Sequence, residues 1–299
     1  MTMVRSARMD DLESTAGMLN EHARGLHGVD DMTSTDLKLY WESPDVEFDT
    51  DVVVAEAPGG EIVGYADLGI YGEHVWLDVR GTEPEALPSL LGEIEERAAA
   101  RKPDLALLGY TSDQDDPLKR LYDESGYELI RHSFRMRIEL DQQPPDPDWP
   151  DGYTVRTPRE GEERRFYDAQ MASFADTWMF APEPYESWRH YMVDDSVFDP
   201  ALWLVAEQGD DLAGILIARV PENEPGVGWI RILGVVPEHR QRGLGQALLR
   251  RSFRDFAGRG FDAVGLGVDA ENPTGAVRLY ERAGMHVERT SLIYEKHQG

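Results

Sequence analysis

Short apolar segments separated by polar turns run through the second half of the chain. The clearest period lies at 244–257, where Leu244, Ala247, Leu248 and Phe256 recur on one face of a helix. The order of the predicted elements, β-α-α-β-β-β-α-β-α-β, indicates a mixed α/β sheet. The predicted strands are 153–156, 202–207, 212–220, 229–236, 263–268 and 286–294, and the predicted helices are 162–173, 185–193, 244–257 and 274–283.

The first half of the chain repeats the second. Matching dipeptides, tripeptides and glycines occur in the same order in both halves, at spacings of 150 or 151 residues early on and 158 residues later. The change in spacing fits a longer loop around 221–228 in the second copy. Ordered matches at near-constant spacing predict a tandem duplication. The matches are Val4-Arg5 with Val155-Arg156, Val54-Ala55-Glu56 with Val205-Ala206-Glu207, Gly64 with Gly214, Leu121-Tyr122 with Leu279-Tyr280, and Gly126 with Gly284.

A proline-rich and acidic segment separates the two copies. Four prolines and four acids between Leu140 and Tyr153 preclude a packed helix or a central strand. We therefore predict a first domain at 1–140, a linker at 141–152 and a second domain at 153–299.

Composition narrows the class of protein. The formal net charge is −27, which disfavours nucleic-acid binding because such a surface repels phosphates. The chain has no cysteine, which excludes disulfides and thiolate metal sites, and we expect no metal cofactor. No apolar run is long enough to span a membrane and the N-terminus is not a secretory signal, so we expect a cytoplasmic protein. Composition leaves the oligomeric state open, as it does the choice between a salt-adapted and a GC-rich source.

A glycine- and arginine-containing turn follows the strand predicted at 229–236. The turn holds Arg240, Arg242, Gly243 and Gly245, and a helix begins directly after it. A helix N-terminus presents unpaired amides and a partial positive charge, glycines let the backbone approach a ligand closely, and arginines add charge-assisted hydrogen bonds. The pattern predicts a site for a pyrophosphate.

Two other interpretations of this turn are a purely structural role and a dinucleotide-binding site. A glycine-rich β–α turn with solvated arginines is the structural alternative. A dinucleotide site is disfavoured, because Leu248 stands where the third glycine of the Gly-x-Gly-x-x-Gly pattern would be.

Together with a second motif, the turn resembles the GNAT superfamily of N-acetyltransferases. Arg240-x-x-Gly243-x-Gly245 is similar to the family's acyl-CoA pyrophosphate loop, and 268–285 resembles its final strand–helix unit. The resemblance implies that Asn272 contacts the CoA arm and that Tyr280 lies near the thioester sulfur. It also implies that acetyl-CoA is bound by the backbone amides of Arg240, Gln241, Arg242, Gly243, Leu244 and Gly245.

The resemblance implies a fold and an activity for the whole chain. The fold would be two tandem GNAT-like domains, each a mixed, mostly antiparallel sheet flanked by helices, which is also the layout of the mycothiol synthases. The activity would be transfer of an acyl group, by expectation acetyl, from acyl-CoA to the primary amine of a small molecule by direct attack. The alternative is a non-catalytic acyl-CoA-binding regulatory protein. No residue of the sequence identifies the amine.

Acyl transfer to an amine needs a neutral amine, a stabilised oxyanion and a protonated leaving thiolate. Tyr280 can donate the last proton, since a phenol has a pKa of about 10 and a thiol about 8.5; packing on a helix face is its alternative role. For the oxyanion we expect a backbone amide of Leu233, Gly234 or Val235.

The general base is not evident from the sequence. The strand 229–236 lacks the glutamate that many GNAT members carry there. A water chain, Asp176, Glu183 or His190 are the candidates. The acceptor pocket is expected around the aromatic connection 174–185, which could hold an organic cation; burial of this connection against the other lobe is the alternative.

The first copy has lost the phosphate loop by this alignment. Offsets of 157 and 158 put Glu83 and Glu85 where Arg240 and Arg242 stand, and Pro88 where Gly245 stands. Two glutamates would repel a pyrophosphate, and proline lacks an amide proton. We expect Ala86 at the Gly243 position, Gln114 at the Asn272 position and Tyr122 at the Tyr280 position, with Tyr122 serving core packing.

Overall fold

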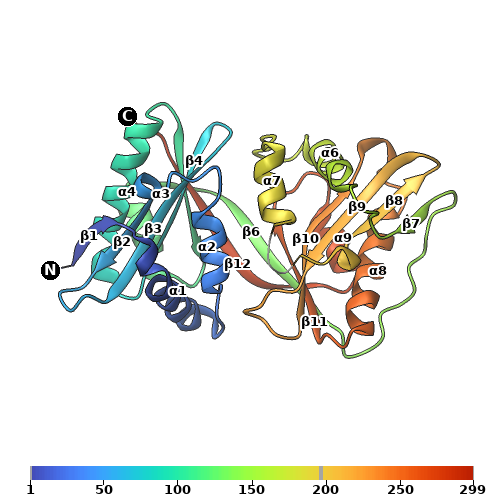
Figure 1. Ribbon diagram of the computed structural model, residues 1–299, viewed down its shortest axis with the longest axis horizontal. Coiled ribbons are helices and arrows are strands. Elements are labelled where there is room, and N and C mark those ends of the chain that lie inside the picture. Colours follow the sequence, from blue (N-terminus) through green and yellow to red (C-terminus); the bar gives the residue numbers. More distant parts are fainter. Residues whose placement is uncertain (1, 195–197, 299) are drawn as a thin grey trace. The chain divides into compact units, whose positions relative to one another are not determined.

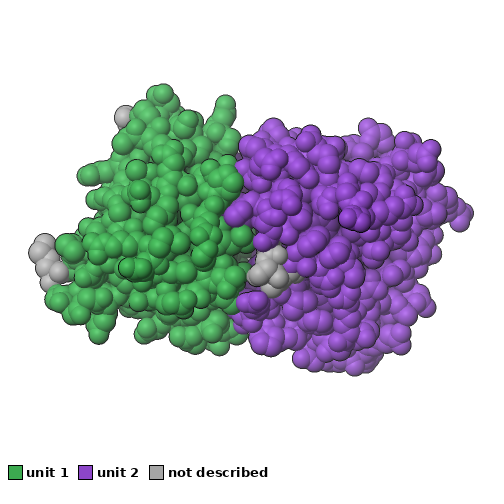
Figure 2. Space-filling view, in the orientation of Figure 1, with its two compact units in different colours: residues 1–133, 290–299 green, residues 134–289 purple. Residues whose placement is uncertain are grey.

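The structure, a computed structural model, describes residues 2–194 and 198–298. The chain forms two compact units, shown in different colours in Figure 2. Unit 1 comprises residues 1–133 and 290–299, and unit 2 comprises residues 134–289. Each unit has a mostly antiparallel sheet flanked by helices, as predicted (Figure 1).

Unit 1 contains strands β1 to β5, which are neighbours in the sheet in the order in which they occur in the chain. All adjacent pairs among them are antiparallel except β4 and β5. The elements are β1 (Met3–Ser6), α1 (Leu12–His27), α2 (Ser34–Trp41), α3 (Phe48–Asp51), β2 (Val52–Glu56), β3 (Ile62–Tyr71), β4 (His74–Gly81), α4 (Leu87–Arg101), β5 (Ala106–Ser112), α5 (Asp116–Glu124) and β6 (Glu128–Glu139), the last of which ends in unit 2.

Unit 2 repeats this arrangement, with β7 to β11 adjacent in sequence order and only the β10–β11 pair parallel. The elements are β7 (Thr154–Arg156), α6 (Glu163–Phe174), α7 (Tyr185–Met192), β8 (Leu204–Gln208), β9 (Asp211–Arg219), β10 (Val227–Val235), α8 (Leu244–Gly258), β11 (Ala263–Asp269), α9 (Ala276–Arg282) and β12 (His286–Lys296), the last of which ends in unit 1.

The element order predicted for the second copy is confirmed, and its boundaries agree to within two residues. The strand predicted at 202–207 begins later, because Pro200–Leu202 forms a 3-10 turn whose amide at Ala201 is capped by the Asp199 side chain.

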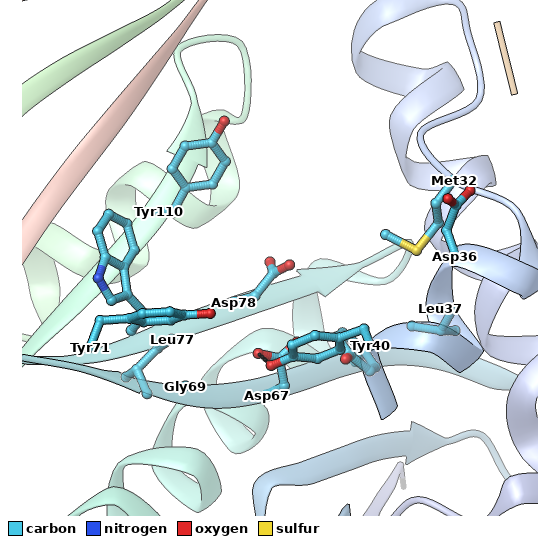
Figure 3. Close-up of a pocket in the computed structure, with 12 residues that line it drawn as sticks. Met32, Asp36, Leu37, Tyr40, Asp67, Gly69, Tyr71, Leu77, Asp78 and Tyr110 are labelled. Atoms are coloured by element: carbon cyan, nitrogen blue, oxygen red, sulfur yellow. Dashed lines mark hydrogen bonds between the residues drawn. The ribbon is translucent and has the colours of Figure 1, made fainter. Parts of the chain in front are cut away.

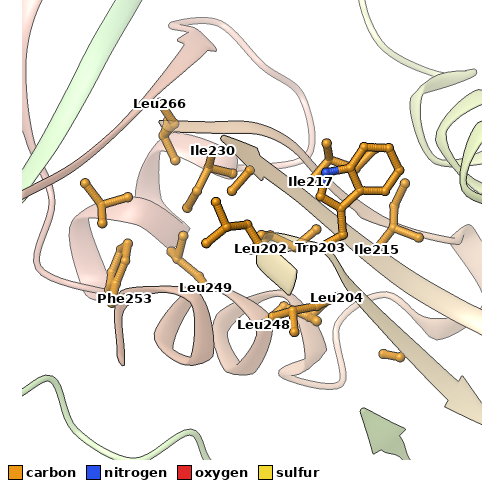
Figure 4. Packing of buried hydrophobic residues seen from close by; sticks show 14 of the residues in the cluster. Leu202, Trp203, Leu204, Ile215, Ile217, Ile230, Leu248, Leu249, Phe253 and Leu266 are labelled. Carbon is orange, nitrogen blue, oxygen red and sulfur yellow. The ribbon is translucent and has the colours of Figure 1, made fainter. Parts of the chain in front are cut away.

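The apolar face predicted for 244–257 packs on the sheet of unit 2. Leu244, Ala247, Leu248 and Phe256 are each no more than 1% exposed. Figure 4 shows Leu248, Leu249 and Phe253 of α8 with the core side chains of the strands. This packing fixes the helix against β9 and β10 and so sets the position of the turn that precedes it.

Each unit is completed by a strand that the other copy supplies. Residues Ser291–Lys296 of β12 pair antiparallel with β5, and Leu292 and Tyr294 join the core of unit 1. The second part of β6 lies next to β11 in the sheet order, and Met136 is buried in the core of unit 2. The two copies have therefore exchanged their last strands.

The compact units differ from the contiguous domains predicted at 1–140 and 153–299. The difference arises because local apolar patterning predicts a strand but not the strand with which it pairs. The segment 141–152 has no helix or strand, as predicted, yet it belongs to unit 2 rather than joining two domains. Trp149 packs against the core of that unit, and Arg254 of α8 donates to the carbonyl of Pro144 at 3.0 Å.

Candidate active site

The strands β10 and β11 separate part-way along their length. Their pairing runs from Val227 with Ala263 to Ile230 with Leu266. Beyond a bulge at Ile230/Ile232, the residues Leu233, Gly234 and Val235 keep register with β9 on one side only, within the described residues. Their other edge and the end of β11 line a pocket of ≈ 970 Å³. Backbone amides on that edge are therefore available to a ligand.

The predicted phosphate loop closes one end of this pocket, which we call the unit 2 pocket. Gly243 is the N-cap of α8 with φ 87°, and Gln241 has φ 61°. These left-handed conformations turn successive amides toward one side, which makes an anion-binding concavity at the start of a helix. A side chain at Gly243 would meet nothing within 4 Å, so the backbone there faces open space. The site residues from Arg240 to Gly245 lie together, and all but Arg242 line the unit 2 pocket.

The Arg240 side chain ties the loop to the end of α6. Its guanidinium pairs with Asp176, donates to the Ser173 carbonyl at 2.9 Å and to the Val235 carbonyl at 3.2 Å. The hydrogen bonds between Arg240 and Asp176 raise the pKa of the arginine and lower the pKa of the aspartate. The sequence suggested that this arginine binds phosphate through its charge, whereas the structure gives its side chain a bracing position.

The Arg242 side chain lies along the outer side of the turn. It donates to the Glu238 carbonyl at 2.9 Å and to the Tyr153 hydroxyl at 3.2 Å. The same hydroxyl hydrogen-bonds to His239 Nδ1 at 2.9 Å. These hydrogen bonds stabilise the conformation of the turn. Arg242 and Trp149 also line a second, smaller cavity.

Asn272 lies in the turn between β11 and α9, at the border of the unit 2 pocket. Its side-chain oxygen accepts from the amide of Thr274 at 2.9 Å and from the Thr274 hydroxyl at 2.5 Å. Because these bonds occupy the oxygen, the amide NH2 group of Asn272 is the part available to a ligand.

Tyr280 extends from α9 into the pocket wall. The residue is 8% exposed and lines the unit 2 pocket, and no hydrogen-bond partner of its hydroxyl is found within the part of the chain that the structure describes. Burial raises the pKa of Tyr280 to about 12. The phenol is therefore neutral at pH 7 and keeps a proton that it can donate.

The candidates for the general base differ in their position relative to the pocket and in their ability to accept a proton. Asp176 lines the pocket, but its pairing with Arg240 makes it a weak proton acceptor. Glu183 and His190 are not among the residues that line the pocket. A water chain remains the candidate that fits the arrangement.

Two features of the pocket were not predicted. The Ser173 hydroxyl is buried without a hydrogen-bond partner among the described residues, and it borders the pocket. A side chain on Gly234 would come within 2.9 Å of Ser173, so the glycine lets α6 approach β10 closely. Sequence carried no signal for this contact, because the two residues are far apart in the chain. Phe174, Thr177 and Trp178 also line the pocket, and they belong to the connection 174–185 around which the acceptor pocket is predicted.

Unit 1 lacks the phosphate loop. Five residues, 82–86, connect β4 to α4, whereas eight residues, 236–243, connect β10 to α8. The connection of unit 1 is therefore three residues shorter than that of unit 2. Ala86 and Gly243 are the N-caps of the two helices, at the predicted offset of 157, so counting back from the helices places Glu83 and Glu85 where Arg240 and Arg242 stand. Pro88 still stands in the first turn of α4.

Two further findings bear on the class of protein. No group of three or more histidines, aspartates or glutamates that could hold a metal ion occurs within residues 2–194 and 198–298. Among the described helices, none is long and apolar enough to cross a membrane.

Comparison with known proteins decides the family. Residues 164–285 match the Acetyltransferase (GNAT) family. The mycothiol acetyltransferase of Streptomyces bingchenggensis is 30% identical over 254 residues, which cover 81% of this chain and 80% of that protein. The chain belongs to the GNAT family of acetyltransferases. It is an acyl-CoA-dependent N-acetyltransferase. This confirms the predicted enzymatic activity rather than the alternative of a non-catalytic regulatory role.

Solved structures support the tandem GNAT fold. A GCN5-related N-acetyltransferase from Sphaerobacter thermophilus superposes with a TM-score of 0.79 at 29% identity, covering 99% of this chain and 95% of that one. A tandem GNAT protein from the clavulanic acid biosynthesis pathway superposes with a TM-score of 0.75 at 16% identity, covering 100% and 99%. The second likeness concerns the fold alone. Both agree with the duplication predicted from the internal repeat.

Proposed function

We propose that unit 2 transfers the acetyl group of acetyl-CoA to the primary amine of a small molecule. One observation carries this proposal: a single pocket extends from the N-terminus of α8, past the open edge of β10, to Tyr280. A pyrophosphate, a pantetheine arm and a thioester need those three environments in that order.

Each part of the pocket supplies one interaction in this scheme. The amides of Arg240 to Gly245 bind the pyrophosphate with the positive end of α8 behind them. The amide NH2 group of Asn272 donates to the CoA arm. The open edge of β10 at Leu233, Gly234 and Val235 donates to the pantetheine and to the oxyanion.

Tyr280 acts on the leaving sulfur. The amine nitrogen bonds to the thioester carbon, the carbon–sulfur bond then breaks, and the thiolate takes up a proton while the nitrogen loses one. A phenol with a pKa of about 12 holds its proton until negative charge develops on the sulfur, so its hydrogen bond is strongest late in the reaction. Solvent returns the proton to the phenol after the nitrogen has lost its own.

The amine loses its proton to water in this scheme. The pocket carboxylate at Asp176 is held by Arg240 with a lowered pKa, which favours a water chain over a direct carboxylate base. The rate should then rise with pH toward the pKa of the amine itself.

The name of the relatives suggests the first acceptor to test. Mycothiol acetyltransferases are among the proteins most similar to this chain, at 28–34% identity over long alignments. We propose that the free-amine precursor of mycothiol is the acceptor, with other small primary amines as the wider class.

Steady-state turnover with acetyl-CoA tests the proposal. Release of CoA is followed with a thiol reagent across a panel of small amines, and the protein adds no background because it has no cysteine. The mycothiol precursor carries a thiol of its own, so its acetylation is followed by loss of primary amine. Continuous turnover with one of these amines is expected. Absence of turnover with every amine, while acetyl-CoA binds at one site per chain, would contradict the proposed acceptor class.

A further inference from the structure

Unit 1 contains a cavity of its own, of ≈ 350 Å³, which Figure 3 shows from close by. No residue of the β4–α4 connection 82–86 is among those that line it. We call it the unit 1 cavity. Its lining comes from α2 and Met32 just before it, from the neighbouring strands β3 and β4, and from β5, all of which belong to unit 1. The residues are Met32, Asp36, Leu37, Tyr40, Tyr65, Asp67, Gly69, Tyr71, Trp76, Leu77, Asp78 and Tyr110.

Aromatic rings form much of the wall. Four tyrosines and a tryptophan line the cavity, on three different strands and one helix. Tyr71 and Tyr110 are 51% and 38% exposed, so a ligand can reach their rings from solvent. The negative faces of such rings attract cations at close range.

Carboxylates face the same space, and no lysine, arginine or histidine is among the described residues that line it. Asp67 and Asp78 are direct partners across the antiparallel β3–β4 pair. Like charges in that position destabilise a sheet. Figure 3 shows Asp67 beside Tyr40 and Asp78 pointing into the cavity, with Asp36 on the facing helix.

The surroundings compensate these acids only in part. Asp67 is 8% exposed and accepts hydrogen bonds from the hydroxyls of Tyr40, at 2.8 Å, and Tyr65. Arg80 is not among the residues that line the cavity, but its guanidinium holds both oxygens of Asp78, with Nε donating to Oδ1 at 2.8 Å and an ion pair to Oδ2 at 2.7 Å. A carboxylate has about four acceptor positions, so both groups keep capacity for another donor. Burying one aspartate directly opposite another costs stability that packing alone would not require.

We propose that the unit 1 cavity binds a small organic ammonium cation, with its charged group between Asp67 and Asp78 and its apolar body against the aromatic rings. The ammonium N–H groups would complete the acceptor positions of both carboxylates. The cation would also remove the repulsion between the paired strands. The cavity volume suits a molecule of about ten non-hydrogen atoms, at the lower end of the size of known ligand pockets. This inference is independent of the reaction proposed for unit 2.

Calorimetry on the full chain with phenethylammonium chloride tests the inference, with 2-phenylethanol as the neutral probe of similar shape. We expect the ammonium to bind unit 1 at one site and the alcohol to bind at least about tenfold more weakly, since ion pairing supplies most of the difference. Equal binding of both probes would overturn the proposal.

Variants locate the site. Asp67→Asn, which keeps the shape of the side chain, should remove one binding site per chain, while any amine bound in unit 2 would remain. Asp116→Asn, on the exposed surface of the same unit, is the matched control and should leave binding unchanged. An unchanged number of sites in Asp67→Asn would exclude the unit 1 cavity.

The exposed ring of Tyr71 provides a second pair of variants in case Asp67→Asn folds poorly. Tyr71→Phe retains the ring face and should bind phenethylammonium within about twofold of the original protein. Tyr71→Leu removes the ring and should weaken binding by about fivefold. The same affinity for both variants would show that the ring takes no part, and the aromatic recognition would be wrong.

Discussion

Units 1 and 2 share one topology but differ in where each leaves space for a ligand. In unit 2, the eight-residue connection 236–243 turns amides toward a pocket between β10 and β11, and Tyr280 borders that pocket. In unit 1, the connection is 82–86, and Tyr122 is fully buried, with ring contacts to Tyr127 and Tyr294. The cavity of unit 1 lies instead among α2, β3, β4 and β5.

Tyr122 in unit 1 and Tyr280 in unit 2 occupy corresponding positions but have different surroundings. A side chain at Gly109 would come within 2.5 Å of the Tyr122 ring, so that ring lies against the β5 backbone. This confirms the core role predicted for Tyr122. A duplicated fold thus keeps the residue that supports its packing in one copy, while the other copy holds it at the edge of a pocket.

The largest effect is expected at Gly243, where the difference between the units is greatest. Gly243→Trp places a bulky side chain in the open space of the unit 2 pocket. It also forces a non-glycine residue to adopt a φ of 87°, which favours glycine. Loss of two charge-assisted hydrogen bonds, each worth about 1.5–3 kcal/mol, lowers affinity about 100-fold or more. Titration calorimetry should find one acetyl-CoA site per chain, which this variant loses.

Glu85→Trp, in the corresponding connection of unit 1, is the control and should bind acetyl-CoA normally. A second acetyl-CoA site that survives in Gly243→Trp would break the comparison, because unit 1 would then bind the co-substrate without the loop.

Removing the hydroxyl of Tyr280 should separate catalysis from binding. Tyr280→Phe is expected to lower kcat by about 100-fold or somewhat less, the lower range for general acids, while the Kd for acetyl-CoA changes little. Tyr122→Phe, the same change in unit 1, should leave kcat unaltered. If chemistry is rate-limiting and both variants turn over at the original rate, Tyr280 has no part in proton transfer.

The stability of the protein should depend on Asp67 in a direction set by its pKa. Burial and the neighbouring Asp78 raise the pKa of Asp67 to about 7 from 3.8. The folded state therefore holds a proton that the unfolded state releases, and stability falls as pH rises from 3.8 through 7. Asp67→Asn should raise the free energy of unfolding at pH 8 by up to about 4 kcal/mol and change it little at pH 3.5.

Denaturant unfolding at both pH values measures this difference. Asp116→Asn, with its carboxylate on the surface, serves as the control. A loss of stability in Asp67→Asn at pH 8 would mean that the ionised carboxylate is stabilising, which contradicts the destabilising β3–β4 pair described for unit 1.

The smallest effect is expected for the brace between Asp176 and Arg240. Asp176→Asn removes an ion pair of partly exposed side chains, worth at most about 1 kcal/mol, and should raise the Kd for acetyl-CoA no more than about fivefold. The kcat and its pH profile should stay as they were, with Asp210→Asn in the β8–β9 turn as control. A large fall in kcat would instead identify Asp176 as the general base.

The sequence alone determined the local elements, the duplication and the position of the glycine- and arginine-containing turn before α8. Apolar spacing predicts burial, and glycines and arginines before a helix predict an anion site, so Gly243 could be named from its neighbours in the chain. Tyr280 could be named only from the resemblance of 268–285 to the GNAT family. Tertiary structure decided the rest. Which strand completes each sheet, the turning of Arg240 toward Asp176, the approach of Ser173 to Gly234 and the opposition of Asp67 and Asp78 all depend on contacts between residues distant in sequence. A local pattern carries no information about such partners, because register and packing are set only when the whole sheet forms.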